Sequence, residues 1–323
     1  MIATITLNPS LDEFIMVHGL LLEETNRWVR LRRYAGGKGI DVARAIHEMG
    51  GETMAYGFIG GDNGRDVEIL LDEEGVSFSF TPIKRNTRIN FIINDAKSHR
   101  QTIIGAPGPH ISRKDLERFF NKLRHIRPVP EMVAVGGSVP PGVPVSIYYD
   151  IIREFHKLGV RTILDAEGQW LREGIEAKPY LIKPNVHEAG IMLGRELNSE
   201  EEIIDAAFEL LERGPEIVVI SRDKDGLIAA ASDKACKAVP PPVKVRSSVG
   251  AGDCATAGLA LKLASGESLA VACWLAAAMG AAAVLTPGTE LSRRADVERL
   301  LPLVKSWEIP VDGRRKVAFP VEV

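Results

Sequence analysis

Cysteine is scarce in this chain of 323 residues, and the few that occur form no metal or disulfide pattern. The three cysteines, Cys236, Cys254 and Cys273, are an odd number and contain no CxxC pair. Disulfide frameworks and zinc clusters draw on paired cysteines, so neither is expected to organise the fold. We expect the protein to work in the reducing cytoplasm.

The sequence also lacks an excess of charge of either sign and an uninterrupted hydrophobic run. The formal net charge of −3 and the pI of about 6.2 give no electrostatic reason to expect a nucleic-acid or membrane partner. The longest apolar stretch, residues 269–285, is rich in alanine and contains Gly280, so it predicts a close-packed buried helix and no membrane span. The seven histidines have no HxH or HxxxH spacing, which argues against a histidine metal cage.

Short apolar β-rich runs alternate along the chain with helical patterns. This rhythm predicts a doubly wound α/β fold with a mostly parallel sheet covered by helices on both faces. The expected strands are 3–7, 53–59, 132–136, 161–165, 180–183, 217–221 and 227–231. The expected helices are 38–49, 65–74, 113–123, 145–158, 200–213, 252–264, 269–283 and 294–303.

Two regions break this rhythm, because β patterns follow one another there without a helix between them. Residues 11–34 and 87–104 are therefore expected to pair into a small separate β-sheet that serves as a lid. Residues 1–10, 35–86 and 105–307 would form the nucleotide- and substrate-binding core. Residues 308–323 have no helical period, and a terminal strand and a loose arm both stay open for them.

The sharpest chemical pattern is Ser248-Val249-Gly250-Ala251-Gly252-Asp253, which opens an alanine-rich helix. Small residues let backbone amides approach an anion, and the helix dipole adds positive charge at the same place. Asp253 in the first turn could take a proton from an attacking hydroxyl, as phosphoryl transfer requires. The alternative is that Asp253 is a plain N-cap and that the glycines serve only a tight turn.

A second glycine-rich loop, Ala35-Gly36-Gly37-Lys38-Gly39, also enters a helix. Its spacing is neither that of a P-loop nor that of a dinucleotide fingerprint, which disfavours a dinucleotide-dependent oxidoreductase. Glycines would let a sugar hydroxyl touch the backbone, and Lys38 carries a mobile positive charge suited to phosphate.

A third pattern, Lys183-Pro184-Asn185-Val186-His187-Glu188, follows an expected strand. Asn185 and Glu188 share a face of a helix and could orient the water shell of Mg²⁺. A capping box, with Asn185 as N-cap and Glu188 reaching back, explains the same spacing equally well. Arg27, Lys38 and Arg88 could converge on a second phosphate, although each alone is more often a solvated surface charge.

Taken together, these motifs resemble the ribokinase/PfkB family of sugar kinases over nearly the whole chain to about Val304. Within that family the resemblance is strongest to the phosphosugar branch of 1-phosphofructokinases, tagatose-6-phosphate kinases and PfkB-type 6-phosphofructokinases. Besides the three patterns above, the matching segments are 7–12, 40–44, 57–61, 87–90, 137–142 and 280–289.

The resemblance implies a ribokinase-like fold and a role for each matching residue. It places Asp12, Gly36, Gly37 and Asp41 on sugar hydroxyls. It places Arg27, Lys38, Arg88, Asn90 and Ser138 around the phosphate that the substrate already carries. It makes Gly250, Ala251 and Gly252 an anion hole with Asp253 as the catalytic base. It sets Lys183, Asn185, Glu188, Ser221, Gly226 and Ser248 around ATP and its Mg²⁺, with Asn185 and Glu188 toward the metal.

Two residues depart from the family pattern. Asp41 stands where asparagine is usual, and a carboxylate there accepts hydrogen bonds but cannot donate one. Asp223 stands where the loop Ser221 to Gly226 usually has a glycine, and it brings a negative charge toward the nucleotide. Aspartate is among the residues that tolerate a positive φ at such a position.

The sequence thus predicts an ATP- and Mg²⁺-dependent kinase of phosphofructokinase type that acts on a sugar phosphate. The resemblance also implies a homodimer formed through the lid. A kinase for an unphosphorylated sugar or nucleoside is the first alternative. A non-catalytic sensor of sugar or nucleotide on the same fold is the second, and Asp41 and Asp223 are the residues that keep it open.

Overall fold

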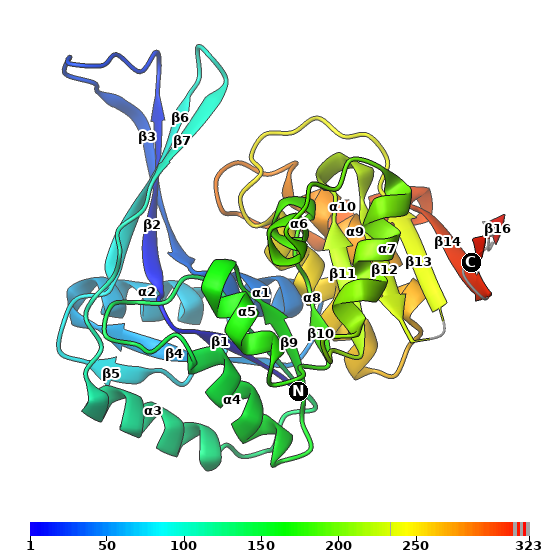
Figure 1. The fold of residues 1–323 in the computed structure, drawn as a ribbon. Coiled ribbons are helices and arrows are strands. Elements are labelled where there is room, and N and C mark those ends of the chain that lie inside the picture. The colour runs from blue at the N-terminus through cyan, green and yellow to red at the C-terminus, as the bar shows by residue number, and fades with distance from the viewer. Residues whose placement is uncertain (233, 313–314, 317–318, 321–323) are drawn as a thin grey trace.

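The structure is a computed structural model that describes residues 1–232, 234–312, 315–316 and 319–320. It is a mixed α/β fold, with one large sheet of 12 strands and a separate sheet of 4 strands that rises from one side (Figure 1). The fold class predicted from the sequence is confirmed.

The large sheet is parallel through its centre. Its strands are β1 (Ile2–Thr6), β4 (Thr53–Gly60), β5 (Thr81–Ile83), β8 (Met132–Gly136), β9 (Arg161–Asp165), β10 (Leu181–Ile182), β11 (Ile217–Ser221), β12 (Leu227–Ala231), β13 (Lys234–Val239), β14 (Lys305–Asp312), β15 (Arg315–Lys316) and β16 (Phe319–Pro320). They lie in the order β15-β14-β13-β12-β11-β10-β9-β8-β1-β4-β5, with β16 beside β14. Neighbours from β5 to β11 in this order are parallel, and β12, β13 and β14 continue the sheet antiparallel.

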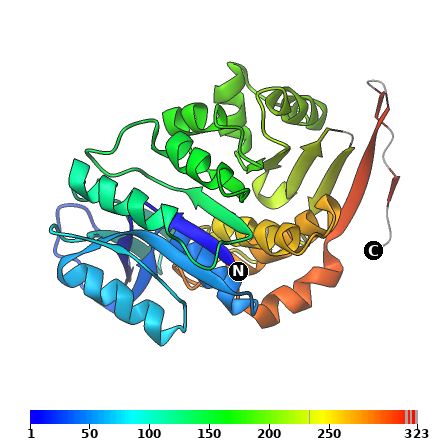
Figure 2. The ribbon, with the colours of Figure 1, turned by 90° about the horizontal axis from the view of Figure 1, so that it is seen from below.

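Helices cover both faces of this sheet, as Figure 2 shows from below. They are α1 (Lys38–Glu48), α2 (Gly61–Glu73), α3 (Arg113–Arg124), α4 (Ile147–His156), α5 (Gly168–Ile175), α6 (Val186–Leu193), α7 (Glu200–Leu211), α8 (Ala251–Ala264), α9 (Leu269–Ala283) and α10 (Arg294–Leu300). Helices α3 to α7 share one face, and α1, α2, α8, α9 and α10 share the other.

The central strands are apolar on both sides because both of their faces are covered. Successive side chains of a strand point to opposite faces, so β1 sends Ile5 toward α3 to α7 and Ile2 toward α1 and α8. Strand β8 does the same with Val133 and Met132. The main sheet therefore stands between two separate hydrophobic cores.

The small separate sheet expected from the sequence is the 4-stranded sheet, and its role as a lid stays a prediction. Its strands are β2 (Ser10–Val17), β3 (Trp28–Gly36), β6 (Arg88–Asp95) and β7 (Arg100–Ile104), in the order β3-β2-β6-β7. Phe14, Tyr34 and Ile92 are buried in one small apolar cluster of this sheet. The two sequence regions that break the βα rhythm therefore do pair with each other.

The end of the chain extends the main sheet, since β14 pairs with β13 along six residues. Of the two alternatives left open for the tail, a strand is present as far as the residues are described. Strands β5, β13, β14, β15 and β16 and helices α5 and α6 are additions to the elements that the sequence analysis lists. In the part of the chain that the structure describes, no helix is long and apolar enough to span a bilayer.

Candidate active site

The parallel strands of the main sheet end at a common edge, where the site is built. Strand β1 leads to β4 on one side and β8 leads to β9 on the other, so the crevice outside their carboxyl ends is the expected ligand position. Asn8 follows β1, Ser138 follows β8, Asp165 ends β9 and Lys183 follows β10. The fold thus delivers polar residues from four strands to one place.

Helix α8 points its N-terminus at this edge. Its N-cap, Gly250, has φ 81°, and a side chain there would be strained and would collide with Leu291. Within the described residues, the backbone amides of Gly250, Ala251 and Gly252 donate to no protein acceptor. The first turn of α8 therefore offers free donors and the positive end of a helix dipole.

Asp253 lies in that first turn, next to two lysines and a second carboxylate. Lys38 Nζ is 3.1 Å from Asp253 Oδ1 and 3.3 Å from Asp165 Oδ2. Lys183 Nζ is 3.1 Å from the same Asp165 oxygen, which also accepts from Thr256 Oγ1 at 2.9 Å. Lys183 Nζ is also 3.6 Å from where a Cβ would stand at Gly252, so both ammonium groups flank the free amides.

The pKa values of this network follow from its pairing. Burial raises the pKa of Asp165, but the charges of Lys183 and Lys38 outweigh burial and leave that pKa below its usual range. Burial likewise lowers the pKa of Lys38, and the charges of Asp165 and Asp253 outweigh it and raise the net value. Both side chains are therefore held in their charged forms.

On the lid side of the crevice, Asp12 of β2 forms a small polar cradle. Its Oδ1 accepts from Ser10 Oγ at 2.7 Å and from Asn90 Nδ2 at 2.9 Å. A Cβ at Gly36 would collide with the Asp12 carboxylate, so only glycine lets the backbone of the loop pass this close. Burial raises the pKa of Asp12, and the two hydrogen bonds and the charge of Arg88 offset this rise only in part.

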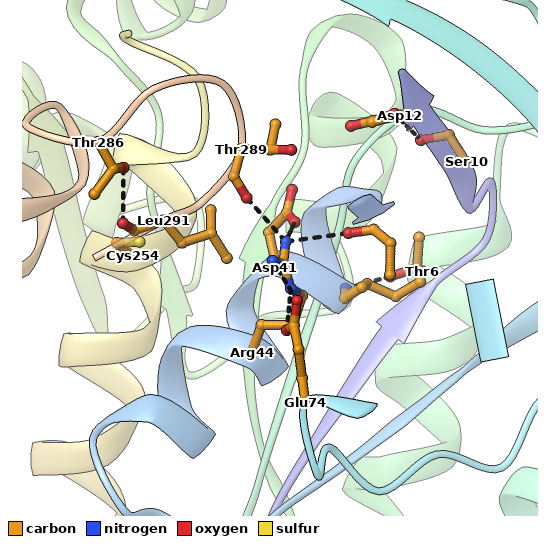
Figure 3. Close-up of polar contacts among 12 residues, drawn as sticks. Thr6, Ser10, Asp12, Asp41, Arg44, Glu74, Cys254, Thr286, Thr289 and Leu291 are labelled. Atoms are coloured by element: carbon orange, nitrogen blue, oxygen red, sulfur yellow. Dashed lines mark hydrogen bonds and ion pairs between the residues drawn. The ribbon is translucent and has the colours of Figure 1, made fainter. Parts of the chain in front are cut away.

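Asp41 lies on the buried side of α1, beside an arginine that sequence reasoning missed. Arg44 Nη1 is 3.3 Å from Asp41 Oδ1 and also donates to the carbonyl oxygens of Ala35 and Thr289, both at 3.1 Å. Its other edge holds both oxygens of Glu74, at 2.6 and 2.8 Å. Figure 3 shows Arg44 between Asp41 and Glu74, with Asp12 on the neighbouring strand.

Arg88 and Ser138 meet where the sequence expected a substrate phosphate. Arg88 donates to Ser138 Oγ at 3.2 Å and to the carbonyl oxygens of Asn8 and Ala106. These residues line a cavity of about 520 Å³ that extends to Trp170. Burial lowers the pKa of Arg88, which still leaves the guanidinium charged at neutral pH.

A second cavity, of about 1030 Å³, lies between α6, the start of α7 and the carboxyl end of β11. Asn185, Ser221 and Asp223 line it, and Asn185 and Ser221 form an isolated β-bridge. Asp223 has φ 49°. This is the positive φ that the sequence analysis considered for an aspartate in place of the usual glycine. Its neighbour Arg222 pairs with Glu200 at 3.1 Å, so that arginine is committed to a partner other than Asp223.

The capping alternative for Asn185 and Glu188 is present in the structure. Glu188 N donates to Asn185 Oδ1, and Asn185 N donates to Glu188 Oε2, both at 2.8 Å. Glu188 Oε1 makes no hydrogen bond within the described part of the chain, and burial raises the pKa of this carboxyl group. No cluster of three or more acidic, histidine or cysteine ligands occurs among the described residues. A magnesium ion that keeps most of its waters and touches one carboxylate and phosphate oxygens fits this set.

Two loops of the core contact the lid above the crevice. Glu290, in the loop after α9, accepts from Tyr34 Oη at 3.1 Å and is paired with Arg32, both on β3. Phe14 of β2 packs against Gly288 of the same loop. Gln101 of β7 hydrogen-bonds Ser247, just before α8.

Two predicted site residues do not join the others within this chain. Arg27 is exposed in the β2–β3 connection, next to Trp28. Trp28 pairs with the last residue of β2, whereas Arg88 pairs with the first residue of β2. Arg27 therefore lies at the opposite end of the lid from the Arg88 cavity. Ser248 is exposed and makes no side-chain hydrogen bond among the described residues, while its neighbour Ser247 is buried and bonded. Lys38 does reach the site, but its ammonium lies on Asp165 and Asp253.

Comparison with known proteins shows which family has this arrangement. The family model of pfkB family carbohydrate kinases matches residues 5–296. The chain belongs to this family. It is accordingly a carbohydrate kinase, a phosphotransferase to an alcohol acceptor, as the glycine motifs predicted.

Individual members of the family are similar over almost the full length. A 1-phosphofructokinase of Bacillus subtilis is 34% identical, covering 94% of this chain and 99% of its own. An ATP-dependent 6-phosphofructokinase isozyme 2 of Mycobacterium tuberculosis is 35% identical, covering 94% and 89%. The crystal structure of phosphofructokinase-2 from Escherichia coli with substrates and products superposes with a TM-score of 0.89 at 32% identity, covering 93% and 98%.

Proposed function

We propose that this kinase transfers the γ-phosphoryl group of ATP to a hydroxyl of a sugar phosphate of the phosphofructokinase type. The observation that carries the proposal is the place of Asp253, in the first turn of α8 beside three free backbone amides. The names of the similar enzymes, which act on phosphorylated hexoses, support the choice of a sugar phosphate as acceptor.

The chemistry follows from this geometry. The acceptor hydroxyl gives its proton to the Asp253 carboxylate as its oxygen bonds to the γ-phosphorus. The bond from that phosphorus to the β–γ bridging oxygen breaks, and its electron pair leaves with ADP. The amides of Gly250 to Gly252, with Lys38 and Lys183 beside them, stabilise the charge on the moving group.

The two cavities supply the two ligand positions. The phosphate already on the sugar would lie against Arg88 and Ser138, and the sugar hydroxyls against Asp12 and Asp41. The nucleotide would lie along Asn185 and Ser221, which line the second cavity, and beside Gly226, which follows Asp225 of the same lining. Mg²⁺, when bound, would neutralise the charge of the nucleotide phosphates, and Glu188 is the carboxylate proposed to contact it.

Replacement of the proposed base tests the mechanism. Asp253→Asn should lower kcat by roughly 10²–10⁴-fold because the amide cannot take the proton. Binding of the sugar phosphate, measured by calorimetry, should persist. Asp72→Asn, an exposed carboxylate on α2, is the matched control. An Asp253→Asn enzyme with wild-type turnover would overturn the assignment.

The wild-type enzyme can decide between acceptor classes in one experiment. A coupled assay for ADP release over fructose 6-phosphate, fructose 1-phosphate, tagatose 6-phosphate and the free sugars should respond to a phosphorylated sugar. Faster turnover of an unphosphorylated sugar or a nucleoside would favour the first alternative. Ligand binding without ADP release for any acceptor would favour a sensor.

We also propose that the protein is a cytoplasmic homodimer joined through its lid. All three cysteines are free and buried, which suits a reducing compartment. The lid exposes large apolar side chains, among them Trp28 at 64%, Ile103 at 55% and Ile104 at 54%. Such a patch on a rigid sheet is typical of a surface that a second subunit covers.

A further inference from the structure

Asp41 is a buried acid with one oxygen paired and the other open. Only 5% of the residue is exposed, and its Oδ1 faces Arg44 Nη1 at 3.3 Å. Its Oδ2 makes no hydrogen bond to any described residue, yet it is not among the side-chain oxygens fully sealed from solvent. The open oxygen therefore has access to the crevice, where a ligand can reach it.

The charged groups that face Asp41 are mostly negative. Asp253 approaches from α8 and Asp12 from β2, and both place a carboxylate in its field. Cys254 of α8 also faces it, and burial raises the pKa of that thiol to about 12, so it stays neutral. Lys38, on the same helix as Asp41, gives its charge to Asp165 and Asp253. In the loop after α9, Glu290 is paired with Arg32 and Arg293.

Arg44 is the one cation in contact with Asp41 among the described residues, and its charge is already committed. Its Nε and Nη2 hold both oxygens of Glu74 at 2.6 and 2.8 Å, the geometry of a strong bidentate pair. Its Nη1 is shared among Asp41 and two carbonyl oxygens, and the contact with Asp41 is the longest of the three. Arg44 therefore offsets the negative charges around Asp41 only in part.

We propose that Asp41 carries a proton in the working enzyme and donates a hydrogen bond from its open oxygen to a sugar hydroxyl. In a site shielded from water, an ionised Asp41 would add a second negative charge next to Asp253. That state has a higher free energy than a protonated Asp41. Burial and then the charge of Asp253 raise the pKa of Asp41 well above its usual range, and Arg44 only partly offsets them.

This assignment, which rests on the proposed function, gives the two sugar-side acids different tasks. Asp12 already accepts hydrogen bonds from Ser10 and Asn90 through Oδ1, so its carboxyl group is assigned the role of acceptor toward the sugar. Asp41 supplies the complementary donor. The site would thus recognise two hydroxyls in opposite hydrogen-bonding senses, and sugar affinity would fall as pH rises through the pKa of Asp41.

Infrared spectroscopy tests the proton without relying on any substrate. The wild-type enzyme at pH 7 should show the carbonyl band of a protonated buried carboxyl group, and Asp41→Asn should remove it. Asp72→Asn should leave the band unchanged. Absence of the band from the wild type at pH 7 overturns the proposal, whether or not the protein phosphorylates a sugar phosphate.

Binding of fructose 6-phosphate and fructose 1-phosphate tests the donor role. Kd is measured by calorimetry from pH 5 to 9, and the ratio of the wild-type Kd to that of Asp41→Asn cancels the ionisation of the sugar phosphate itself. The ratio of the wild-type Kd to the Asp41→Asn Kd should vary by no more than about threefold over the pH range in which the infrared band is present. It should rise about tenfold per pH unit above the pH at which the band is lost. A ratio unchanged after the band is lost overturns the donor role. If neither sugar phosphate binds, the proposed function fails while the infrared result still decides the proton.

Discussion

At the scale of single residues, Asp165 holds Lys38 and Lys183 in place although no proposed ligand touches it. It ends β9, is 6% exposed, and meets Lys183, Lys38 and Thr256 through one oxygen. Lys183 is itself only 4% exposed. An uncompensated ammonium at that depth is costly, so Asp165 keeps both the fold and the positive charge beside α8 in order.

Replacement of Asp165 should therefore affect stability and catalysis together. We expect Asp165→Asn to lower the free energy of unfolding by about 3 kcal/mol, because Lys183 stays buried without its counter-charge. Urea unfolding measures this, with Asp72→Asn as the exposed control. A loss as small as that of the control would show that Lys183 finds another partner.

The same pair makes a pH prediction whose sign follows from the lowered pKa of Asp165. A carboxyl group with a lowered native-state pKa stabilises the fold fully above its unfolded-state value, near 3.8, and loses this effect as pH falls through the native-state value. The stability difference between wild type and Asp165→Asn should thus be constant near neutrality and shrink below about pH 4.

Site residues could be predicted from the sequence only where a motif combines small residues with one reactive group. Such motifs contain Asp253 with the glycines before it. They also contain Gly36, whose backbone passes close to the Asp12 carboxylate. Asp165 has no local pattern, because its partners lie 18 or more positions away in the chain. Arg44 likewise meets Glu74 and Thr289 from distant segments that only the fold brings together. Asp165 at the end of a predicted parallel strand was the available hint.

At the scale of elements, the loop between α9 and α10 links the lid to helix α8. Its Glu290 contacts Arg32 and Tyr34 of β3, and its Leu291 packs on Gly250 at the N-cap of α8. Arg44 binds the carbonyl oxygen of Thr289 in the same loop. The position of the lid and the geometry of the anion hole are therefore connected through four consecutive residues, 288–291.

Weakening this link should loosen the lid more than it slows the chemistry. Glu290→Gln removes the charge that holds Arg32, so KM for the sugar phosphate should rise about threefold to tenfold while kcat changes less. Glu298→Gln breaks an exposed ion pair with Arg294 on α10 and is the matched control. Faster hydrogen exchange of β3 amides should accompany the change in KM. Unaltered exchange would show that apolar packing of Phe14 alone fixes the lid.

Strand and helix types were predictable where an apolar run is continuous, as in β8, β11 and α9. Strand β13 was missed because its sequence, KACKAV, mixes lysine with small residues, and its pairing with β12 and β14 supplies the order instead. Helix α5 was missed because it begins at Gly168 and contains Gly174, two residues with poor helix propensity. Gly174 fits because a Cβ there would crowd Leu164 of β9.

At the scale of the whole molecule, the lid is a thin sheet with one side turned to the crevice and large apolar residues left uncovered. Ile103→Asp should disrupt the proposed dimer, since a carboxylate in an apolar interface cannot be solvated. Light scattering should give the mass of two chains for the wild type and of one for the variant. Ile69→Asp on α2, at the same 55% exposure, should stay dimeric. A wild type that scatters as a single chain would contradict the lid interface.

The ion pair between Lys38 and Asp253 has a consequence for the idle enzyme. While the ammonium stays paired with that carboxylate, a water molecule near a bound nucleotide would meet the proposed base already engaged in an ion pair. An arriving sugar phosphate would draw Lys38 toward its own negative charge and free the base only then. The enzyme would in this way keep ATP intact until an acceptor is in position.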